Sequence, residues 1–174
     1  MKSIREIFRI GYGPSSSHTM GPRKAAEIFL AAHPNAARYQ AHLYGSLSAT
    51  GKGHLTDAAI IDVIPAVEIV WHEDFLPFHP NGMRFCAWDS QENLLDDWTV
   101  YSVGGGALAE ENQEPGTKNK DSLLSTLNSQ LSTDIYPLTR LSEIKDYCDQ
   151  MGWDYWEYVE HYEGKEIWDY LREV

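Results

Sequence analysis

Cysteine is scarce in this sequence, with two in 174 residues, and this scarcity excludes the proteins that are built on cysteine frameworks. Cys86 and Cys148 lie far apart and form no C-x-x-C pair. Neither a disulfide framework nor a zinc knuckle is therefore expected, and no metal ligand set is assigned to this chain.

Basic residues are also few: Lys and Arg number 14 against 26 Asp and Glu, which gives a formal net charge of −12. Such a field repels a phosphate backbone, so no nucleic-acid partner is expected. Residues 142–174 hold ten acidic and three basic side chains. The acidity is therefore concentrated at the C-terminal end of the sequence.

Long apolar runs are missing as well. Residues 1–6 lack the apolar stretch of a signal peptide. No segment approaches the roughly 18 consecutive apolar residues of a membrane span. We therefore expect no membrane partner and a location in the reducing cytoplasm. Hydrophobic residues, at 43%, and aromatic residues, at 12%, are in contrast numerous enough for a packed core, and the length suits one compact domain with a small appendage.

The pattern of apolar and turn residues predicts an α+β fold. Helices are expected over residues 3–9, 21–32 and 56–64, and strands over 39–44, 67–71, 83–88, 99–103 and 107–110. Residues 112–134 are polar and predict a loop insert, and three short helices divided by Gly152 and Gly164 are expected from Leu141. This order predicts a domain over 1–140, a mostly antiparallel sheet with helices packed on it, and a C-terminal helical extension over 141–174.

The first segment that can carry chemistry is Gly13–Gly21, with the sequence GPSSSHTMG. Its hydroxyls and backbone N–H groups precede a helix that opens at Gly21 and Pro22, where free N–H groups and the helix dipole favour an anion such as a carboxylate. His18 adds a group that exchanges protons near neutral pH. Hydroxyls also cap helices, so a simple capping loop with a surface histidine explains these residue types about equally well.

A second segment, Gly45–Asp57, has the sequence GSLSATGKGHLTD and superficially resembles a phosphate-binding loop. The spacing is wrong, because five residues separate Gly45 from Gly51 where the motif needs four, and Gly53 replaces the Ser or Thr after the lysine. The glycines instead indicate close approach of the backbone to something small. His54 lies just before a helix that Thr56 or Asp57 can cap. A tight structural turn with a solvated lysine is the alternative.

Two further segments have mainly structural interpretations. Asn81–Gly82 between alternating runs is typical of a hairpin, and the histidines and acids around it fit no standard metal spacing. Gly104–Gly106 indicates a bulge or sharp turn, since no G-x-G-x-x-G pattern surrounds it. The aromatic residues beyond residue 150 are typical of packing positions.

Taken together, these segments resemble the iron–sulfur-dependent L-serine dehydratases (L-serine ammonia-lyases). The matching pieces occur in family order, cover about residues 5–110 and are Gly11–Pro22, Tyr44–Leu47 with Thr50–Asp57, Asn81–Met83 and Tyr101–Gly106. Each segment alone is a weak indication of the family, but four segments in the family's order are a specific one.

The resemblance implies a two-part enzyme of which this chain is the β domain or β chain. The other part, α, carries the cysteines of a 4Fe-4S cluster that acts as a Lewis acid on the serine hydroxyl. A base removes the Cα proton, water leaves, and the aminoacrylate hydrolyses to pyruvate and ammonia. The resemblance also implies a sheet fold like the allosteric substrate-binding domain of some phosphoglycerate dehydrogenases, and a homo-oligomer.

The resemblance assigns the family's functional roles only to those residues of this sequence that match the family's motifs. His54 is the candidate general base, because the pKa of a histidine lies near working pH, and His18 is a candidate for orienting substrate or relaying a proton. Hydroxyls of the first segment are candidates for binding the carboxylate and amino groups of L-serine, with Lys52 and Asn81 as weaker candidates. The hydroxyl set is Ser15, Ser16, Ser17 and Thr19. A stand-alone regulatory module that binds serine is the rival hypothesis.

Overall fold

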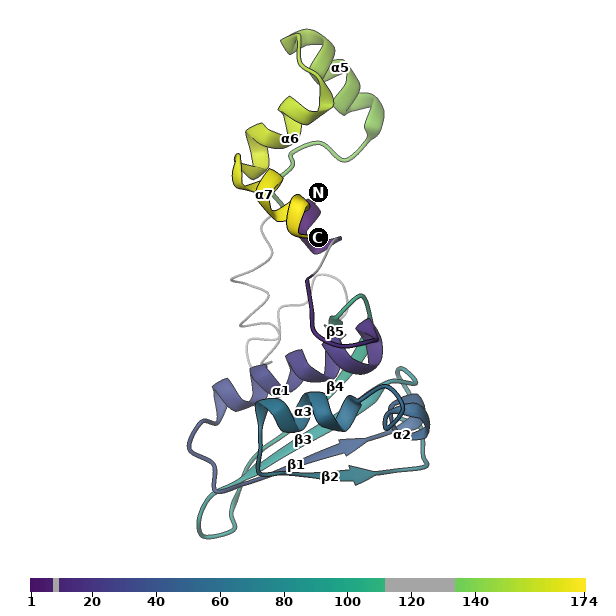
Figure 1. The fold of residues 1–174 in the computed structure, drawn as a ribbon, viewed down its shortest axis with the longest axis vertical. Helices are drawn as coiled ribbons and strands as arrows, with labels where there is room; N and C mark the ends of the chain where they lie inside the picture. Colours follow the sequence, from purple (N-terminus) through teal and green to yellow (C-terminus); the bar gives the residue numbers. More distant parts are fainter. Residues whose placement is uncertain (8–9, 112–133) are drawn as a thin grey trace. The chain divides into compact units, whose positions relative to one another are not determined.

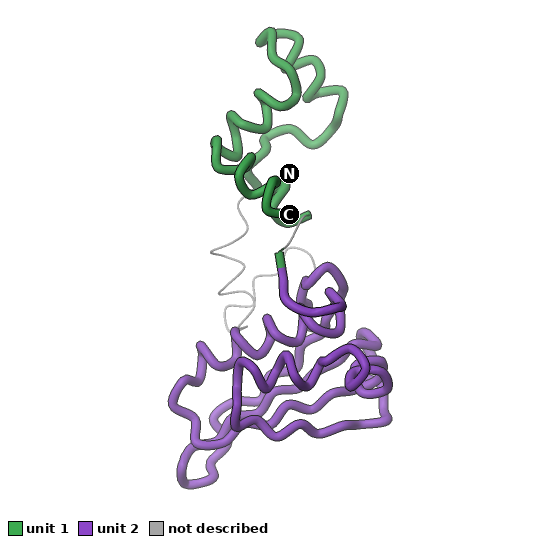
Figure 2. Tube along the Cα trace, in the orientation of Figure 1, with its two compact units in different colours: residues 1–10, 128–174 green, residues 11–127 purple. Residues whose placement is uncertain are grey.

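The computed structural model describes residues 1–7, 10–111 and 134–174. The chain divides into two compact units, Met1–Ile10 with Asn128–Val174, and Gly11–Leu127 (Figure 2). We call the first the helical unit and the second the sheet unit. The loop insert predicted over 112–134 lies, except for its last residue, outside the described residues.

The sheet unit carries a five-stranded sheet in the order β2-β1-β3-β4-β5. Its strands are β1 (Arg38–Leu43), β2 (Val67–Trp71), β3 (Gly82–Trp88), β4 (Leu94–Gly104) and β5 (Ala107–Ala109). β1 and β2 pair in parallel, because two helices, α2 (Gly45–Thr50) and α3 (Thr56–Val63), connect them as a crossover. The other three pairs are antiparallel, which confirms the predicted α+β fold with a mostly antiparallel sheet.

Helices α1 (Gly21–Ala32) and α3 cover one face of this sheet (Figure 1). The predicted helix start is confirmed, with Pro22 in the first turn. The buried side of α1 brings Phe29 against the core, where its ring lies 5.5 Å from that of Phe85 and stacks at 6.2 Å on Trp98. The core therefore lies between the two helices and the sheet, which leaves the opposite strand face to polar residues such as Gln40, His42 and Arg84.

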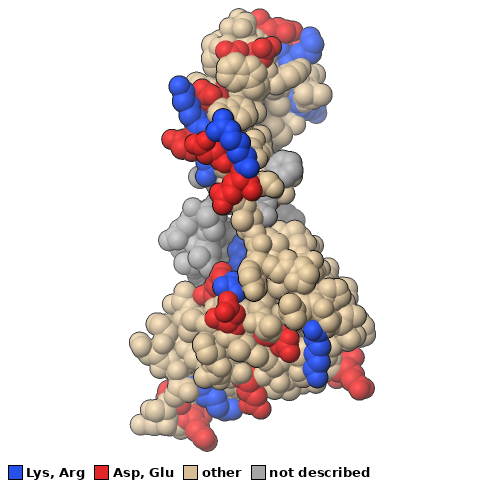
Figure 3. Space-filling model, viewed as in Figure 1, with Lys and Arg blue, Asp and Glu red and all other residues tan. Residues whose placement is uncertain are grey.

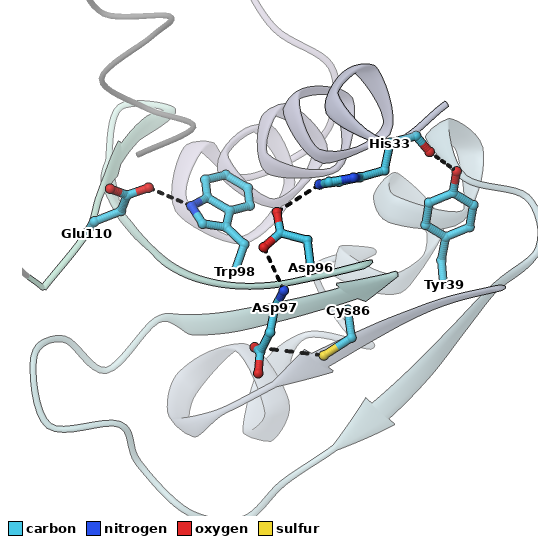
Figure 4. A network of polar contacts seen from close by, with 7 residues as sticks. All are labelled: His33, Tyr39, Cys86, Asp96, Asp97, Trp98 and Glu110. Atoms are coloured by element: carbon cyan, nitrogen blue, oxygen red, sulfur yellow. Dashed lines mark hydrogen bonds and ion pairs between the residues drawn. The ribbon is translucent and has the colours of Figure 1, made fainter. Parts of the chain in front are cut away.

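Polar tips at the edge of this core are hydrogen bonded (Figure 4). Trp98 Nε1 donates to Glu110 at 2.5 Å, and His33 Nε2 lies 2.8 Å from Asp96 Oδ2. The Tyr39 hydroxyl donates to the His33 carbonyl. These bonds let large aromatic side chains be buried without leaving a polar atom unpaired.

The helical unit contains α5 (Leu141–Met151), α6 (Tyr155–Glu163) and α7 (Glu166–Glu173), with a short 3-10 turn over Ile4–Glu6. Gly152 and Gly164, at φ +66° and +79°, end α5 and α6, as the sequence predicted. A small aromatic core forms around Tyr136, Cys148 and Tyr158. The N-terminal segment belongs to this unit, although the sequence grouped it with the domain over 1–140.

The distribution of charged side chains on the surface agrees with the low number of basic residues in the sequence. On the face shown in Figure 3, acidic and basic side chains are scattered over both units and form no single basic patch. Within residues 1–7, 10–111 and 134–174, no helix is both long enough and apolar enough to cross a membrane.

Candidate active site

The serine-rich segment is more regular than the loop expected from its sequence. Residues Ser16–Met20 form one turn of π-helix that leads directly into α1. Ser15 caps this turn, and its Oγ accepts a hydrogen bond from the His18 backbone N–H at 3.1 Å. Single π-turns are frequent at functional sites, and this one fixes the backbone position of His18.

The His18 imidazole is held at both ring nitrogens. Nδ1 lies 2.9 Å from Ser17 Oγ, and Nε2 lies 3.0 Å from Ser46 Oγ at the start of α2. Burial first, and the neighbouring His54 second, lower the pKa of His18 below its usual value. A neutral, doubly hydrogen-bonded ring suits a positioning group. Sequence reasoning missed the role of Ser46, although it quoted this residue within a family motif.

The His54 imidazole stands beside that of His18, with ring centroids 4.9 Å apart. Its Nδ1 lies 3.0 Å from the Thr50 carbonyl oxygen. Because a carbonyl oxygen only accepts, Nδ1 must carry the proton, and in the neutral ring the lone pair is then on Nε2. Among the described residues, Nε2 has no hydrogen-bond partner. His54 is thus arranged to accept a proton at Nε2.

Two buried threonines join the segments that carry these histidines. Thr19 Oγ1 donates to the His54 carbonyl at 2.8 Å, and Thr56 Oγ1 donates to the His18 carbonyl at 2.6 Å. Their exposed fractions are 1% and 0%. Each hydroxyl therefore fixes the backbone of the opposite histidine, and the Thr19 hydroxyl is engaged within the protein.

The backbone between His54 and α3 is strained. Leu55 adopts the left-handed conformation, with φ +59° and ψ +35°, which is unfavourable for a branched side chain. Leu55 is the N-cap residue of α3 and Thr56 is its first helical residue, with no side-chain cap. The predicted cap at Thr56 or Asp57 is therefore wrong, because the Thr56 hydroxyl is bound to the His18 carbonyl and Asp57 lies within the helix.

The remaining candidates fall into two groups. Ser16 is exposed beside Ser15 and Ser17 at the start of the turn. Lys52 Nζ lies instead 5.3 Å above the Trp71 ring. Asn81 is 8% exposed, and its Nδ2 donates to the Ser102 carbonyl at 3.1 Å, where it joins the ends of β3 and β4. The structure thus brings the serines, both histidines and Thr19 together, whereas Lys52 and Asn81 have partners elsewhere.

The cysteines do not form a metal site. Cys86 is buried in the sheet unit and Cys148 in the helical unit. Burial raises the pKa of both thiols, which disfavours the thiolate that a cluster needs. The described part of the chain contains no group of three or more His, Cys, Asp or Glu side chains arranged to hold a metal ion.

The segments that carry the two histidines match a known protein family. A family model described as serine dehydratase beta chain matches residues 3–65 and 61–113, which include both histidine segments. L-serine dehydratase TdcG of Escherichia coli (strain K12) is 40% identical over 155 residues, covering 64% of this chain and 34% of that protein.

Two other L-serine dehydratases match a larger share of the chain. L-serine dehydratase 2 of Escherichia coli (strain K12) is 32% identical over 199 residues, and the L-serine dehydratase of Haemophilus influenzae is 29% identical over 196. Each match covers 87% of this chain and 41% of the relative, so the chain spans about two fifths of these proteins. The chain belongs to the serine dehydratase beta chain family.

Proposed function

We propose that this chain supplies the proton-accepting half of an L-serine dehydratase active site, as the β part of an L-serine ammonia-lyase. The observation that carries the proposal is the His54 ring, whose Nδ1–H is bound to the Thr50 carbonyl so that Nε2 holds the lone pair. Family membership and the L-serine dehydratase relatives favour a lyase over a stand-alone regulatory module.

In the proposed reaction, His54 Nε2 takes the Cα proton of L-serine. The bond from Cβ to the hydroxyl oxygen then breaks as the protonated His54 returns a proton to that oxygen, so that one water departs and His54 is neutral again. The resulting aminoacrylate tautomerises to the imine and hydrolyses to pyruvate and ammonia. His18 positions the reacting groups from beside His54 and is held in place by Ser46. The exposed Ser16 hydroxyl and the backbone N–H groups at the start of the π-turn bind the substrate carboxylate, since they offer hydrogen-bond donors to an anion.

The 4Fe-4S cluster implied by the family resemblance does not fit this chain. Its two cysteines are buried in separate units and carry raised pKa values. We therefore assign the cluster to the α part and derive no step through it here. The proposed partners are L-serine and a cluster-bearing α domain or chain, within a homo-oligomeric enzyme of the cytoplasm.

The first test assembles this chain with its α part under anaerobic conditions and measures pyruvate formation from L-serine. His54→Ala should lower kcat by at least about 100-fold, the scale of a positioned base. His42→Gln, a histidine variant on the open face of the sheet, is the matched control and should stay within about twofold of the unchanged enzyme. Near-normal turnover by His54→Ala would exclude the base assignment.

The isolated chain provides the second arm of this test. Without the α part it should form no pyruvate and should show negligible heat of binding with L-serine in calorimetry. Tight binding of L-serine by the chain alone would support the regulatory module instead.

A further inference from the structure

The segment that joins β2 to β3 displays two aromatic side chains to solvent. We call residues 73–81 the aromatic loop. Phe75 is 65% exposed and Phe78 is 46% exposed. Two exposed phenylalanines within four residues form an apolar surface that a soluble protein usually covers.

The aromatic loop is fixed by backbone hydrogen bonds, so the exposure of its two phenylalanines does not result from a lack of contacts with the rest of the sheet unit. The first two amides of α2 bind it, because Gly45 N donates to the Asp74 carbonyl and Ser46 N donates to the Pro80 carbonyl, each at 2.9 Å. At its far end Asn81 exchanges two bonds with Ser102: the side-chain Nδ2 donates at 3.1 Å, and Ser102 N returns one at 3.0 Å. The phenylalanines are thus presented by a preorganised segment.

Each ring is supported from below. Gly45 has φ +54°, and a Cβ placed on it would come within 2.7 Å of the Phe75 ring, so the ring lies directly on glycine backbone. The Phe78 ring lies 4.9 Å from that of the buried Tyr101. Rigid aromatic residues with one face packed and the other exposed are typical hot spots of protein interfaces.

The aromatic loop lies at the sheet end that carries the candidate active site. The strand register brings Leu43 next to Trp71 and Met83, and Gly82 next to Tyr101, at this end. The Pro80 carbonyl that fixes the loop also fixes Ser46, the hydrogen-bond partner of His18. A partner bound to the loop would therefore cover the site directly.

We infer that the aromatic loop is the docking surface for the α part, with Phe75 and Phe78 as its anchors. This inference rests on the proposed function. The length of the relatives points to the occupant. The chain spans only 34–41% of its L-serine dehydratase relatives, so the part of those proteins that the chain does not match is larger than the chain itself. That part is the polypeptide that would complete the half-site. Docking at this end excludes water from His54 and places partner groups beside it.

The test uses the complex of the full chain with its cluster-bearing α chain, produced together and purified anaerobically. Dissociation is followed by analytical ultracentrifugation over a dilution series. Phe75→Ser/Phe78→Ser should raise the Kd by at least about 30-fold, as expected for two interface anchors. The matched control is Leu94→Ser/Leu95→Ser, which changes two residues that are 53% and 49% exposed at the opposite end of the sheet. This control should leave the Kd within about twofold.

The single variant Phe75→Ser keeps the Phe78–Tyr101 contact and guards against misfolding of the double variant; it should still weaken association by about 10-fold or more. Association as tight as that of the unchanged chain in both variants overturns the inference. Loss of a homodimer with no effect on the α chain also overturns it, in favour of a second copy as occupant.

His54→Ala separates this inference from the proposed function. If both the docking surface and the proposed function are right, His54→Ala lowers kcat by at least about 100-fold but associates normally. The phenylalanine variants then regain turnover at saturating α chain. If His54→Ala remains active while the phenylalanine variants dissociate, the base assignment fails and the docking surface stands.

Discussion

At the scale of single residues, the two histidines of the site have different hydrogen-bond partners. His18 is held at both nitrogens by serine hydroxyls, whereas His54 is held at one nitrogen by a carbonyl. The sequence could name both histidines through their motifs. It could not show which histidine has a ring nitrogen that is available to accept a proton. That depends on the contact of Ser46 with His18, which lie 28 residues apart and meet only in the folded chain.

A third histidine, His42, should make the free energy of unfolding depend on pH. Its Nδ1 lies 2.8 Å from His72 Nε2 on the open face of the sheet. Burial, then the charge of His72 and that of Arg84, lower the pKa of His42 below 6.5, against opposing effects of Asp97 and Glu68. The folded state therefore binds fewer protons than the unfolded state, and this group reduces stability as the pH falls below about 6.5.

His42→Gln should remove this contribution. The free energy of unfolding, measured with urea between pH 8 and pH 5, should fall less steeply in the variant than in the unchanged chain. At pH 8, where the His42 imidazole is neutral in both the folded and the unfolded state, the two proteins should differ by no more than about 1 kcal/mol. Parallel pH profiles would mean that His42 does not titrate differently on folding.

At the scale of elements, the α3 start shows where sequence reasoning reached its limit. Periodicity and capping rules predicted α1 with its start at Gly21 and the strands of the sheet, since these depend on local pattern. The cap of α3 was wrong, since the Thr56 hydroxyl is used by the His18 carbonyl, a contact across 38 residues. The left-handed Leu55 likewise has no signal in the sequence, because leucine rarely adopts that conformation.

Leu55→Gly should relieve this strain. Glycine adopts a φ of +59° freely, and Leu55 is 50% exposed, so little packing is lost. We expect the isolated chain to be unchanged or more stable by up to about 1 kcal/mol in urea unfolding, because the relieved strain is partly offset by the entropy of the unfolded glycine. Leu55→Ala keeps the strain and serves as the control. A loss of more than about 1 kcal/mol in both variants would show that the leucine side chain stabilises the site, whereas a loss of this size in the glycine variant alone would show that the unfolded-state entropy of glycine exceeds the strain.

At the scale of the whole molecule, the chain combines two units of different character. The sheet unit carries both histidines of the site and the family motifs, whereas the helical unit carries the acidic α5–α7 segment and residues 1–7. The sequence predicted the three helices from Gly152 and Gly164. It could not place the N-terminal residues with them, since this pairing depends on side-chain contacts across about 160 residues, the separation of Ser3 and Glu163.

Glu163 at the end of α6 makes this pairing. Its Oε2 accepts from Ser3 Oγ at 2.7 Å, and its Oε1 accepts from Ile4 N at 2.7 Å and from the Tyr136 hydroxyl at 2.8 Å. Burial and this carboxylate raise the pKa of Tyr136. Three donors share one charged acceptor, so its removal should cost about 2–3 kcal/mol within the helical unit.

Glu163→Ala tests this pairing at the level of each unit. Hydrogen exchange read by mass spectrometry should lose protection in peptides from α5–α7 and residues 1–7, and should keep it in β1–β4, because all the bonded partners of Glu163 belong to the helical unit. Glu173→Ala removes the same charge from the exposed end of α7 and should leave both units protected. Equal loss of protection in the sheet strands would mean that the units unfold as one, and the stability of the histidine site would then depend on a carboxylate far from it in sequence.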